Sequence, residues 1–226
     1  MMEIINSFAE AFQTIFWGNS RVLEIALLSL FVSGAATIIA ASWGIPIAML
    51  LGLKNFRLKF LIKNFFNTMV AIPTVALGLI LFLALSRSGP LGFLNILYSP
   101  TAIIIGEAIL VTPLIVSFAT SAVEAIDPQI MDLAKTLGAS ESQASFAVLR
   151  EALNGVILAV IVSFNRAISE LGIALMVGGN IVLTTVIANE INRPEGMPLS
   201  ITLTIILLAI VFTTNIAVNI LKRRIK

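Results

Sequence analysis

Residues 25–53 read IALLSLFVSGAATIIAASWGIPIAMLLGL and contain no charged side chain. A transmembrane helix needs about 20 mostly apolar residues to cross a hydrocarbon core of roughly 30 Å, so this run can make one long or tilted crossing. Two crossings would need about 40 residues and a loop. We therefore expect Gly34, Gly44 and Pro46 to kink this helix rather than to turn the chain back.

The composition of the whole chain agrees with a membrane environment. Apolar residues make up 58% of the chain and charged residues 12%, whereas soluble domains have about 45–50% and about 25%. The net charge of +2 is small, and the basic residues cluster at the ends of the apolar segments. This distribution argues against a nucleic acid partner. We expect an all-α integral membrane protein.

Further apolar segments bring the total to about five transmembrane helices in a single domain over residues 21–226. The expected spans are residues 22–53, 64–86, 101–122, 153–177 and 199–221. The N-terminal segment, residues 1–20, is too short to span. Its apolar residues recur at helical spacing, which predicts an amphipathic helix on the outer face of the membrane. A loosely ordered extension is the alternative.

The Lys and Arg residues in the loops predict the orientation of these helices. With the N-terminus outside, the inner segments hold ten basic residues and the outer segments hold three, Arg21, Arg87 and Arg193. The sequence therefore predicts a multi-pass protein of the cytoplasmic membrane with its C-terminus in the cytoplasm.

The loop at residues 123–152 carries strong local signals. Asp127 and Pro128 favour a helix start, and Gly138 suits the left-handed position that ends a helix. Ser140 and Gln143 match a capping box, which predicts a second helix. The small residues near Gly138 would let a partner approach the backbone closely, although interfacial packing is the alternative.

The residues that are missing exclude several kinds of chemistry. The chain has no Cys and no His, so thiolate nucleophiles, His-based acid–base catalysis and the usual zinc sites are not available. A Walker A loop is also absent from the sequence. We therefore expect a non-catalytic chain that binds no metal and does not itself hydrolyse nucleotide.

Residues 132–140 read DLAKTLGAS, and residues 164–172 read FNRAISELG. The first stretch resembles the "EAA" loop of the permeases of bacterial ABC importers, and the second is similar to a motif of molybdate, tungstate and sulfate permeases. Further similar stretches are residues 29–34, 44–46, 72–79 and 89–92. Within this group the closest likeness is to the tungstate permeases, which are short, lack an extra N-terminal span and share the Leu-Thr-Thr sequence found here at residues 183–185.

The resemblance implies a type I ABC importer permease fold and a coupling loop that docks on an ATPase. The residues it assigns to docking are Asp132, Leu133, Ala134, Gly138, Ala139, Ser140 and Leu149. Two positions depart from the family pattern: Asp132 replaces the leading Glu, and Arg150 stands where Pro often follows Leu149.

The resemblance also implies the partners and the cargo. It implies a homodimer, two copies of an ABC ATPase that bind ATP and Mg, and an extracytoplasmic oxyanion-binding protein. The expected cargo is tungstate, with molybdate or sulfate as the alternative. A stand-alone channel or secondary carrier is a further alternative, but it would predict internal repeats, which the sequence does not display.

Charged residues within the spans are functional candidates because they are costly in a membrane. Arg166 and Glu170 are one helical turn apart and can pair, and Glu107 could lie at a similar depth. Arg166 could contact a tetrahedral oxyanion, or the three charges could neutralise one another. Two carboxylates beside one guanidinium leave a net negative site, which favours a structural or gating role. Further pathway or gate candidates are Ser169, Thr74 and Thr112; kink candidates are Pro46, Pro73 and Pro113.

Overall fold

The computed structural model describes residues 10, 11, 13, 19–193 and 195–224. In these residues the secondary structure is helical, with one short 3-10 helix, η1. The amphipathic helix expected at the N-terminus lies almost entirely outside the described residues and stays a prediction. The helices are α2 (Ser20–Leu53), α3 (Lys59–Met69), α4 (Thr74–Leu85), η1 (Gly92–Leu94), α5 (Pro100–Glu124), α6 (Gln129–Thr136), α7 (Glu141–Ile168), α8 (Gly172–Val177), α9 (Leu183–Glu190) and α10 (Met197–Arg224).

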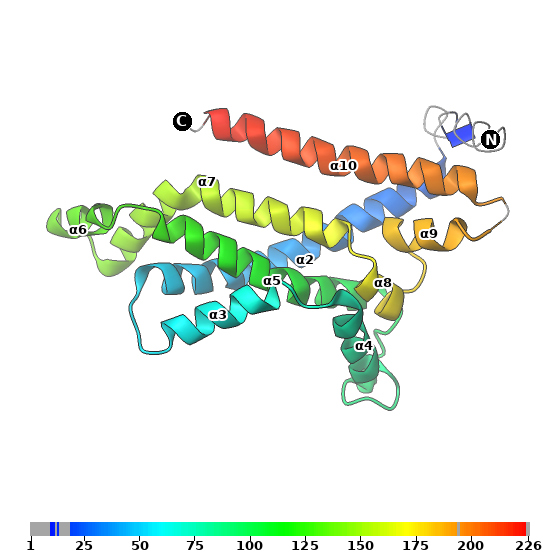
Figure 1. The fold of residues 1–226 in the computed structure, drawn as a ribbon, viewed down its shortest axis with the longest axis horizontal. Coiled ribbons are helices and arrows are strands. Elements are labelled where there is room, and N and C mark those ends of the chain that lie inside the picture. Colours follow the sequence, from blue (N-terminus) through cyan, green and yellow to red (C-terminus); the bar gives the residue numbers. More distant parts are fainter. Residues whose placement is uncertain (1–9, 12, 14–18, 194, 225–226) are drawn as a thin grey trace.

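Helices α2, α5 and α7 form the centre of the molecule and run roughly along its long axis (Figure 1). Their shared core consists largely of small residues, including Ala48 of α2, Ala119 of α5, and Ala152 and Ala159 of α7. Small side chains allow helices in a membrane to approach closely, and the packing between them then supplies the stability. Helix α10 lies along one side of this centre and packs mainly against α9.

The long apolar helices can cross a membrane. Among the described residues, four helices are long and apolar enough for this, and the number rises to five if the bent pair α3–α4 counts as one span. Helices α2, α5 and α10 coincide within a few residues with three of the spans expected from the sequence. The other two expected spans need correction.

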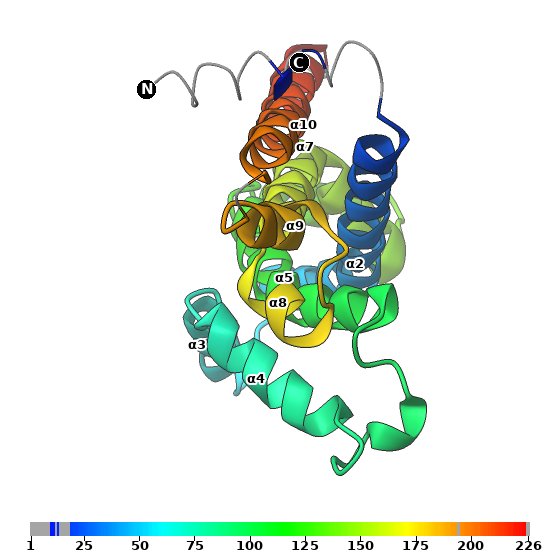
Figure 2. The same ribbon diagram turned by 90° about the vertical axis from the view of Figure 1, so that its right-hand side faces the viewer.

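The expected span over residues 64–86 is not one continuous helix, because the chain breaks before Pro73, which the sequence indicated as a kink position. Helix α3 ends at Met69, α4 begins at Thr74, and the two are bent by 97°. Proline has no backbone N–H and disfavours the helical conformation in the residue before it, here Ile72. Helix α4 turns away from the central helices (Figure 2) and packs chiefly against α8.

The expected helix over residues 153–177 is also wrong in its bounds. Helix α7 begins at Glu141, directly after the predicted capping box, and ends at Ile168. Its start lies far inside the expected loop of residues 123–152, because no residue after Ser140 interrupts the helix. It ends early because the Glu170 side chain caps a new helix, α8.

The three prolines that were candidates for kinks differ in their effect. Pro73 lies directly before α4, at the break between α3 and α4. Pro46 and Pro113 lie inside α2 and α5, and both helices continue through them. Membrane helices tolerate an interior proline because neighbouring groups can satisfy the freed carbonyl.

Candidate functional site

The predicted helix–Gly–helix corner is present between α6 and α7. The Asp127 carboxylate accepts the N–H of Gln129 at 2.9 Å, and Gly138 has a φ of +88°, in the left-handed region. The Ser140 N–H donates to Gln143 Oε1 at 2.8 Å, and the Gln143 N–H donates to Ser140 Oγ at 3.3 Å. These local predictions are confirmed. The two caps could be predicted because each side chain lies within three residues of the N–H group that it binds.

One side of this corner is packed and the other is exposed. Ile130 and Met131 of α6 pack against the central core of α2, α5 and α7. By contrast, Leu133 is 61% exposed, Leu137 80% and Phe146 66%. These three exposed large apolar side chains belong to α6, to its last turn and to the first turns of α7, and exposed apolar groups of this kind are suited to a protein partner. We call Leu133, Leu137 and Phe146 the apolar corner surface.

The other residues assigned to docking lie around this surface. Asp132, Gly138 and Ser140 are exposed, whereas Ala134, Ala139 and Leu149 are partly buried. Leu149 also packs against the central core. A Cβ atom built at Gly138 would meet no heavy atom of the described residues within 4 Å. Gly138 is therefore required for its backbone conformation and leaves open space over the corner.

Ion pairs fix this end of the molecule to the neighbouring helices. Lys54, directly after α2, pairs with Glu141 at the start of α7, with 3.2 Å between Nζ and Oε1. Lys59 and Lys63 of α3 both contact the Glu124 carboxylate at the end of α5. These pairs are partly or largely exposed, so each contributes little to stability. They link the end of α2 with α7, and α3 with α5, beside the corner.

The second group of candidates surrounds the end of α7. Arg166 Nη1 donates to Glu170 Oε2 at 2.6 Å, which confirms the predicted pairing. Glu170 Oε1 accepts the N–H of Gly172 at 2.8 Å and that of Ile173 at 3.3 Å. The Thr184 hydroxyl of α9 donates to the backbone carbonyl of Glu170 at 2.8 Å. Glu170 thus joins α7, α8 and α9.

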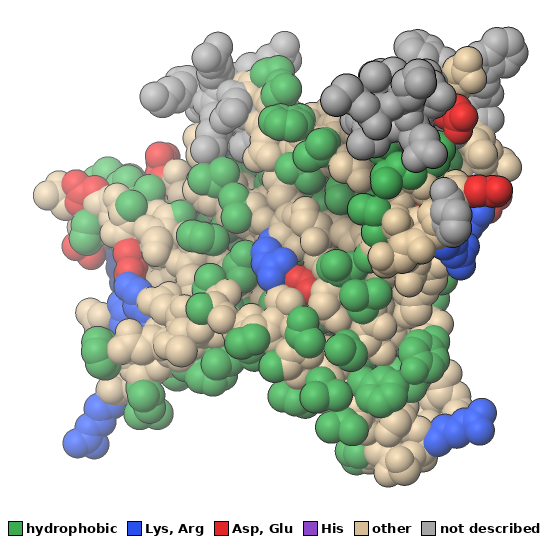
Figure 3. Space-filling view, turned by 45° about the vertical axis from the view of Figure 1, so that its right-hand side comes forward, with side chains coloured by type: hydrophobic (Ala, Val, Ile, Leu, Met, Phe, Trp, Pro, Cys, Tyr) green, Lys and Arg blue, Asp and Glu red, His purple; other side chains and the backbone are tan. Residues whose placement is uncertain are grey.

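Burial differs sharply within this ion pair. The Glu170 side chain is 2% exposed, whereas the Arg166 side chain is 39% exposed. Figure 3 shows a basic side chain beside an acidic one in the middle of a largely apolar face, with the other charged side chains near the ends of the molecule. A half-exposed guanidinium in such a place needs water or a polar partner, because lipid tails cannot solvate it.

Glu107 of α5 is buried near this pair. Its carboxyl group interacts with the Ser33 side chain and electrostatically with Glu170. Glu107 Oε2 has no hydrogen-bond partner in the described part of the chain. The salt bridge of Arg166 is to Glu170, and the structure gives none between Arg166 and Glu107. The three charges therefore lie in one region, but only two are paired.

The remaining pathway candidates divide between two places. Ser169 is exposed at the break after α7, and Thr74 lies at the start of α4 with its hydroxyl against Gly172. Both are close to Glu170 in the structure. Thr112 belongs elsewhere: its hydroxyl accepts the Trp43 Nε1–H at 2.8 Å and donates to the Ala108 carbonyl at 2.7 Å.

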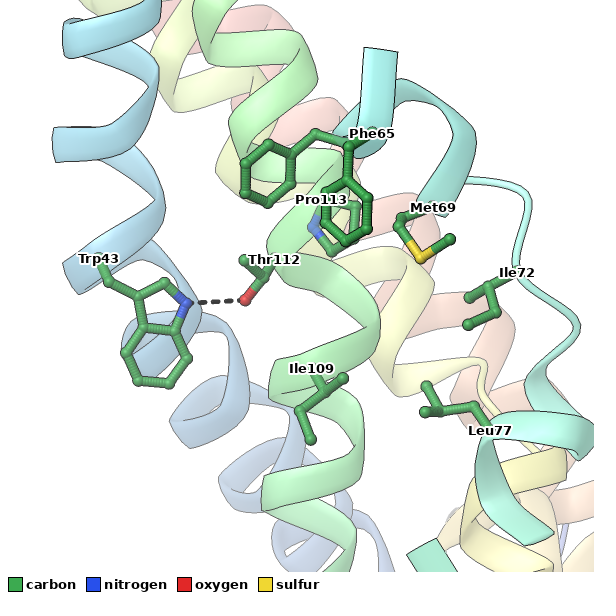
Figure 4. Close-up of a pocket in the computed structure, with 9 residues that line it drawn as sticks. Trp43, Phe65, Met69, Ile72, Leu77, Ile109, Thr112 and Pro113 are labelled. Carbon is green, nitrogen blue, oxygen red and sulfur yellow. Dashed lines mark hydrogen bonds between the residues drawn. The ribbon is translucent and has the colours of Figure 1, made fainter. Parts of the chain in front are cut away.

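Thr112 lines an apolar cavity of about 300 Å³ in the angle between α3 and α4 (Figure 4). The side chains around it come from α2, α3, α4, α5 and the α3–α4 break: Trp43, Phe65, Phe66, Met69, Ile72, Leu77, Ile109, Thr112 and Pro113. No charged residue lines it, so it is not suited to an anion. The structure thus separates Thr112 from the Arg166 group.

One buried carboxylate was missed by the sequence reasoning. Glu190, at the end of α9, is buried and accepts hydrogen bonds from Arg193 at 2.9 Å and Arg21 at 3.4 Å. The pair Glu190–Arg193 has i,i+3 spacing, which could have been noticed. The contact with Arg21 spans 169 positions and leaves no local signal.

Comparison with known proteins decides the family. The family profile "Binding-protein-dependent transport system inner membrane component" matches residues 44–226. The chain belongs to this family. It is therefore a permease subunit of an ABC importer, which confirms the family predicted from residues 132–140 and 164–172, and the membership implies an ATPase and a substrate-binding protein as partners.

Three named permeases are similar in sequence to most of the chain. It is 39% identical to the tungstate uptake system permease protein TupB of Peptoclostridium acidaminophilum, over 95% of this chain and 96% of that protein. It is 31% identical to TupB of Campylobacter jejuni, over 97% of this chain and 94% of that protein. At 28% identity it is similar to the molybdate/tungstate transport system permease protein WtpB of Pyrococcus abyssi, over 84% and 74% of the two chains.

A solved structure supports the fold. A chain of the MetNI methionine ABC transporter, in inward-facing conformations, superimposes with a TM-score of 0.78 at 16% identity. The match covers 94% of this permease and 98% of that chain. The type I ABC importer permease fold expected from the sequence is therefore confirmed.

Proposed function

We propose that this permease carries tungstate into the cell as the membrane-spanning part of an ATP-driven importer. Support for the cargo comes from the two TupB relatives, which match 95% and 97% of the chain. Molybdate is the nearest alternative, because permeases named for molybdate are also similar, at lower identity. Sulfate is a third tetrahedral oxyanion of the same shape and charge.

We further propose that two copies of the permease form the transport path and that each docks on one ATPase subunit. The ATPase subunits would bind ATP and Mg, whereas the permease itself would bind no cofactor. A protein outside the membrane would deliver the oxyanion. The basic residues Lys54, Arg57, Lys59 and Lys63 lie at the α6 end, which supports a cytoplasmic location of this end and an outer location of the N-terminus.

The observation that carries the docking proposal is the apolar corner surface. Leu137 is 80% exposed at a corner whose backbone is fixed on both sides, by Asp127 and by the Ser140 capping box. A rigid corner with exposed apolar side chains can insert into a cleft of a partner and transmit a movement of that partner. Residues 132–140 and Leu149 would form this docking element.

Replacing Leu137 by Ala tests the docking. Full burial of a leucine side chain contributes about 1.5–3 kcal/mol, so we expect affinity for the ATPase to fall roughly 10- to 100-fold. Leu61→Ala is a matched control, because Leu61 of α3 is similarly exposed but lies outside the corner. Equal affinity of the Leu137→Ala variant and the unaltered permease would contradict the docking role.

Cargo is tested by uptake into proteoliposomes that contain the permease, its ATPase and its binding protein. We expect ATP-dependent accumulation of tungstate, and weaker accumulation of molybdate and sulfate at equal concentration. The affinity of the binding protein for the three anions gives an independent measurement. Tight sulfate binding together with indifference to tungstate would refute the assignment.

A further inference from the structure

Arg166 and Glu170 are isolated charges along the chain. From residue 152 to residue 189 they are the only two charged residues. The corner at the start of α7 and the Glu190 group at the end of α9 lie on either side of this interval. Both residues therefore lie well within the part of the permease that spans the membrane.

The Arg166 guanidinium still has donors available. A guanidinium has five N–H groups, and the described residues accept one of its hydrogen bonds, at Glu170 Oε2. Because its side chain is 39% exposed at this depth, the remaining donors face water or a polar partner rather than lipid. The proposed function, in which two copies form the path, requires polar groups that face the solute, and the exposed guanidinium is suited to this role.

A guanidinium without a counter-charge would hold a tetrahedral oxyanion firmly. Its parallel N–H groups fit two oxygen atoms of such an anion, and the interaction is charge-assisted. Conduction requires binding that is weak enough for the solute to leave. A tight site in the path would therefore slow the release of each anion.

The contacts of Glu170 hold a negative charge beside Arg166, and this charge opposes tight binding of an anion. One carboxylate oxygen accepts two backbone N–H groups of α8, and the other binds Arg166. The α8 contacts fix the carboxylate in place, and its burial keeps water from weakening the ion pair. The negative charge thus stays beside Arg166 while the guanidinium remains exposed.

We propose that Glu170 is a positioning residue that compensates the charge of Arg166 and so keeps the path from binding its anionic solute tightly. This inference rests on the proposed function, because it requires an oxyanion as the solute. Glu170 would keep the affinity of the path for the anion low, and the binding protein would select the solute.

The test replaces Glu170 by Gln in the permease–ATPase complex, reconstituted in lipid nanodiscs. Glutamine keeps the size of the side chain and can still accept the Gly172 N–H, but it removes the negative charge. Titration calorimetry with sodium tungstate should show affinity at least roughly tenfold higher than in the unaltered complex, since coupling between close charges commonly reaches this size. In uptake measurements, KM and kcat should fall together.

A second replacement shows whether the gained affinity comes from Arg166. The double variant Glu170→Gln, Arg166→Gln should lose the gain, and a gain that persists would overturn the proposal. Glu190→Gln is the matched control, because it removes a buried glutamate that binds Arg21 and Arg193 away from this site. An equal gain in this control would also overturn the proposal.

A single replacement of Arg166 keeps the proposal testable if Glu170→Gln does not fold. In the presence of Glu170, Arg166→Gln should leave the weak tungstate affinity of the complex unchanged. A clear loss of affinity would show that Arg166 already holds the solute, and this would overturn the proposal.

Failure of the two proposals can be told apart. A complex that accumulates no tungstate refutes the proposed cargo, whatever the variants bind. A complex that accumulates tungstate, but whose Glu170→Gln variant gains no affinity, refutes only the role of Glu170.

Discussion

Gly78 of α4 lies directly against the backbone of Gly172 at the start of α8. A Cβ atom at Gly78 would stand 3.1 Å from the Gly172 carbonyl oxygen and 3.1 Å from the Ile173 Cα. From the other side, a Cβ atom at Gly172 would stand 2.8 Å from Thr74 Oγ1. The two short helices that follow the chain breaks are therefore joined by backbone contact.

Replacing Gly78 by Val should separate these helices. The atoms in the way are mostly backbone atoms, which cannot turn aside, so we expect a cost of about 1–3 kcal/mol. Thermal unfolding in nanodiscs should show a lower Tm than for Gly34→Val, a matched control in α2. At Gly34 a Cβ atom would meet no heavy atom of the described chain within 4 Å. Equal Tm values would show that the α4–α8 contact is looser than the structure indicates.

The corner between α6 and α7 should respond to backbone strain rather than to crowding. Gly138 has a φ of +88° in open surroundings. Gly138→Ala should cost about 1–2 kcal/mol, because a Cβ atom disfavours the left-handed conformation. Gly138→Asn should cost less, since Asn adopts this conformation more readily. Faster hydrogen exchange in residues 129–144 of the Ala variant, but not of the Asn variant, is the expected result.

The local part of the fold could be predicted from the sequence because neighbouring residues determine it. The Asp127 cap, the left-handed Gly138 and the Ser140 box are all formed by groups within three residues of one another. The break at Pro73 could be predicted as a distortion, but not as a bend of 97°, because its size depends on the packing of α4 against α8.

The pairing of Arg166 with Glu170 was predicted, but its surroundings were not, because they also depend on the packing of distant residues. The i,i+4 spacing indicates that Arg166 can bind Glu170, but it assumes one continuous helix. In the structure α7 ends at Ile168, and Glu170 uses its second oxygen to cap α8. Contacts with Thr184 and with α4 stabilise this arrangement, and these come from distant parts of the chain.

Labelling with a thiol reagent can test whether the surface beside Arg166 faces water. The chain contains no cysteine, so each introduced thiol is the only one. Ser169→Cys should react with a charged, water-soluble methanethiosulfonate reagent, because Ser169 is exposed next to the ion pair. Ser163→Cys is the matched control in α7, the helix that precedes Ser169, since Ser163 is fully buried. Absence of labelling at position 169 would indicate that this face meets lipid.

The hydrogen bond between Trp43 and Thr112 should stabilise the contact of α2 with α5. Thr112→Val removes the acceptor and leaves the indole N–H without a partner, which costs about 1–3 kcal/mol where water is absent. Thr112→Ser keeps the hydroxyl and should retain most of the stability. A Tm that falls for Val and stays for Ser confirms the bond. An unchanged Tm for Val would contradict it, and a fall for Ser as large as that for Val would show that the methyl group contributes as much as the hydroxyl.

Helix α7 is one continuous rod of 28 residues, from the capping box beside the corner almost to Glu170. At about 1.5 Å per residue its length is about 42 Å. A tilt of about 5° about the end near the corner would displace the far end by roughly 4 Å. That displacement exceeds the length of the Arg166–Glu170 hydrogen bond, 2.6 Å. A small rotation about one end of the rod would thus move Arg166, near the other end, relative to the α8 N–H groups that hold Glu170.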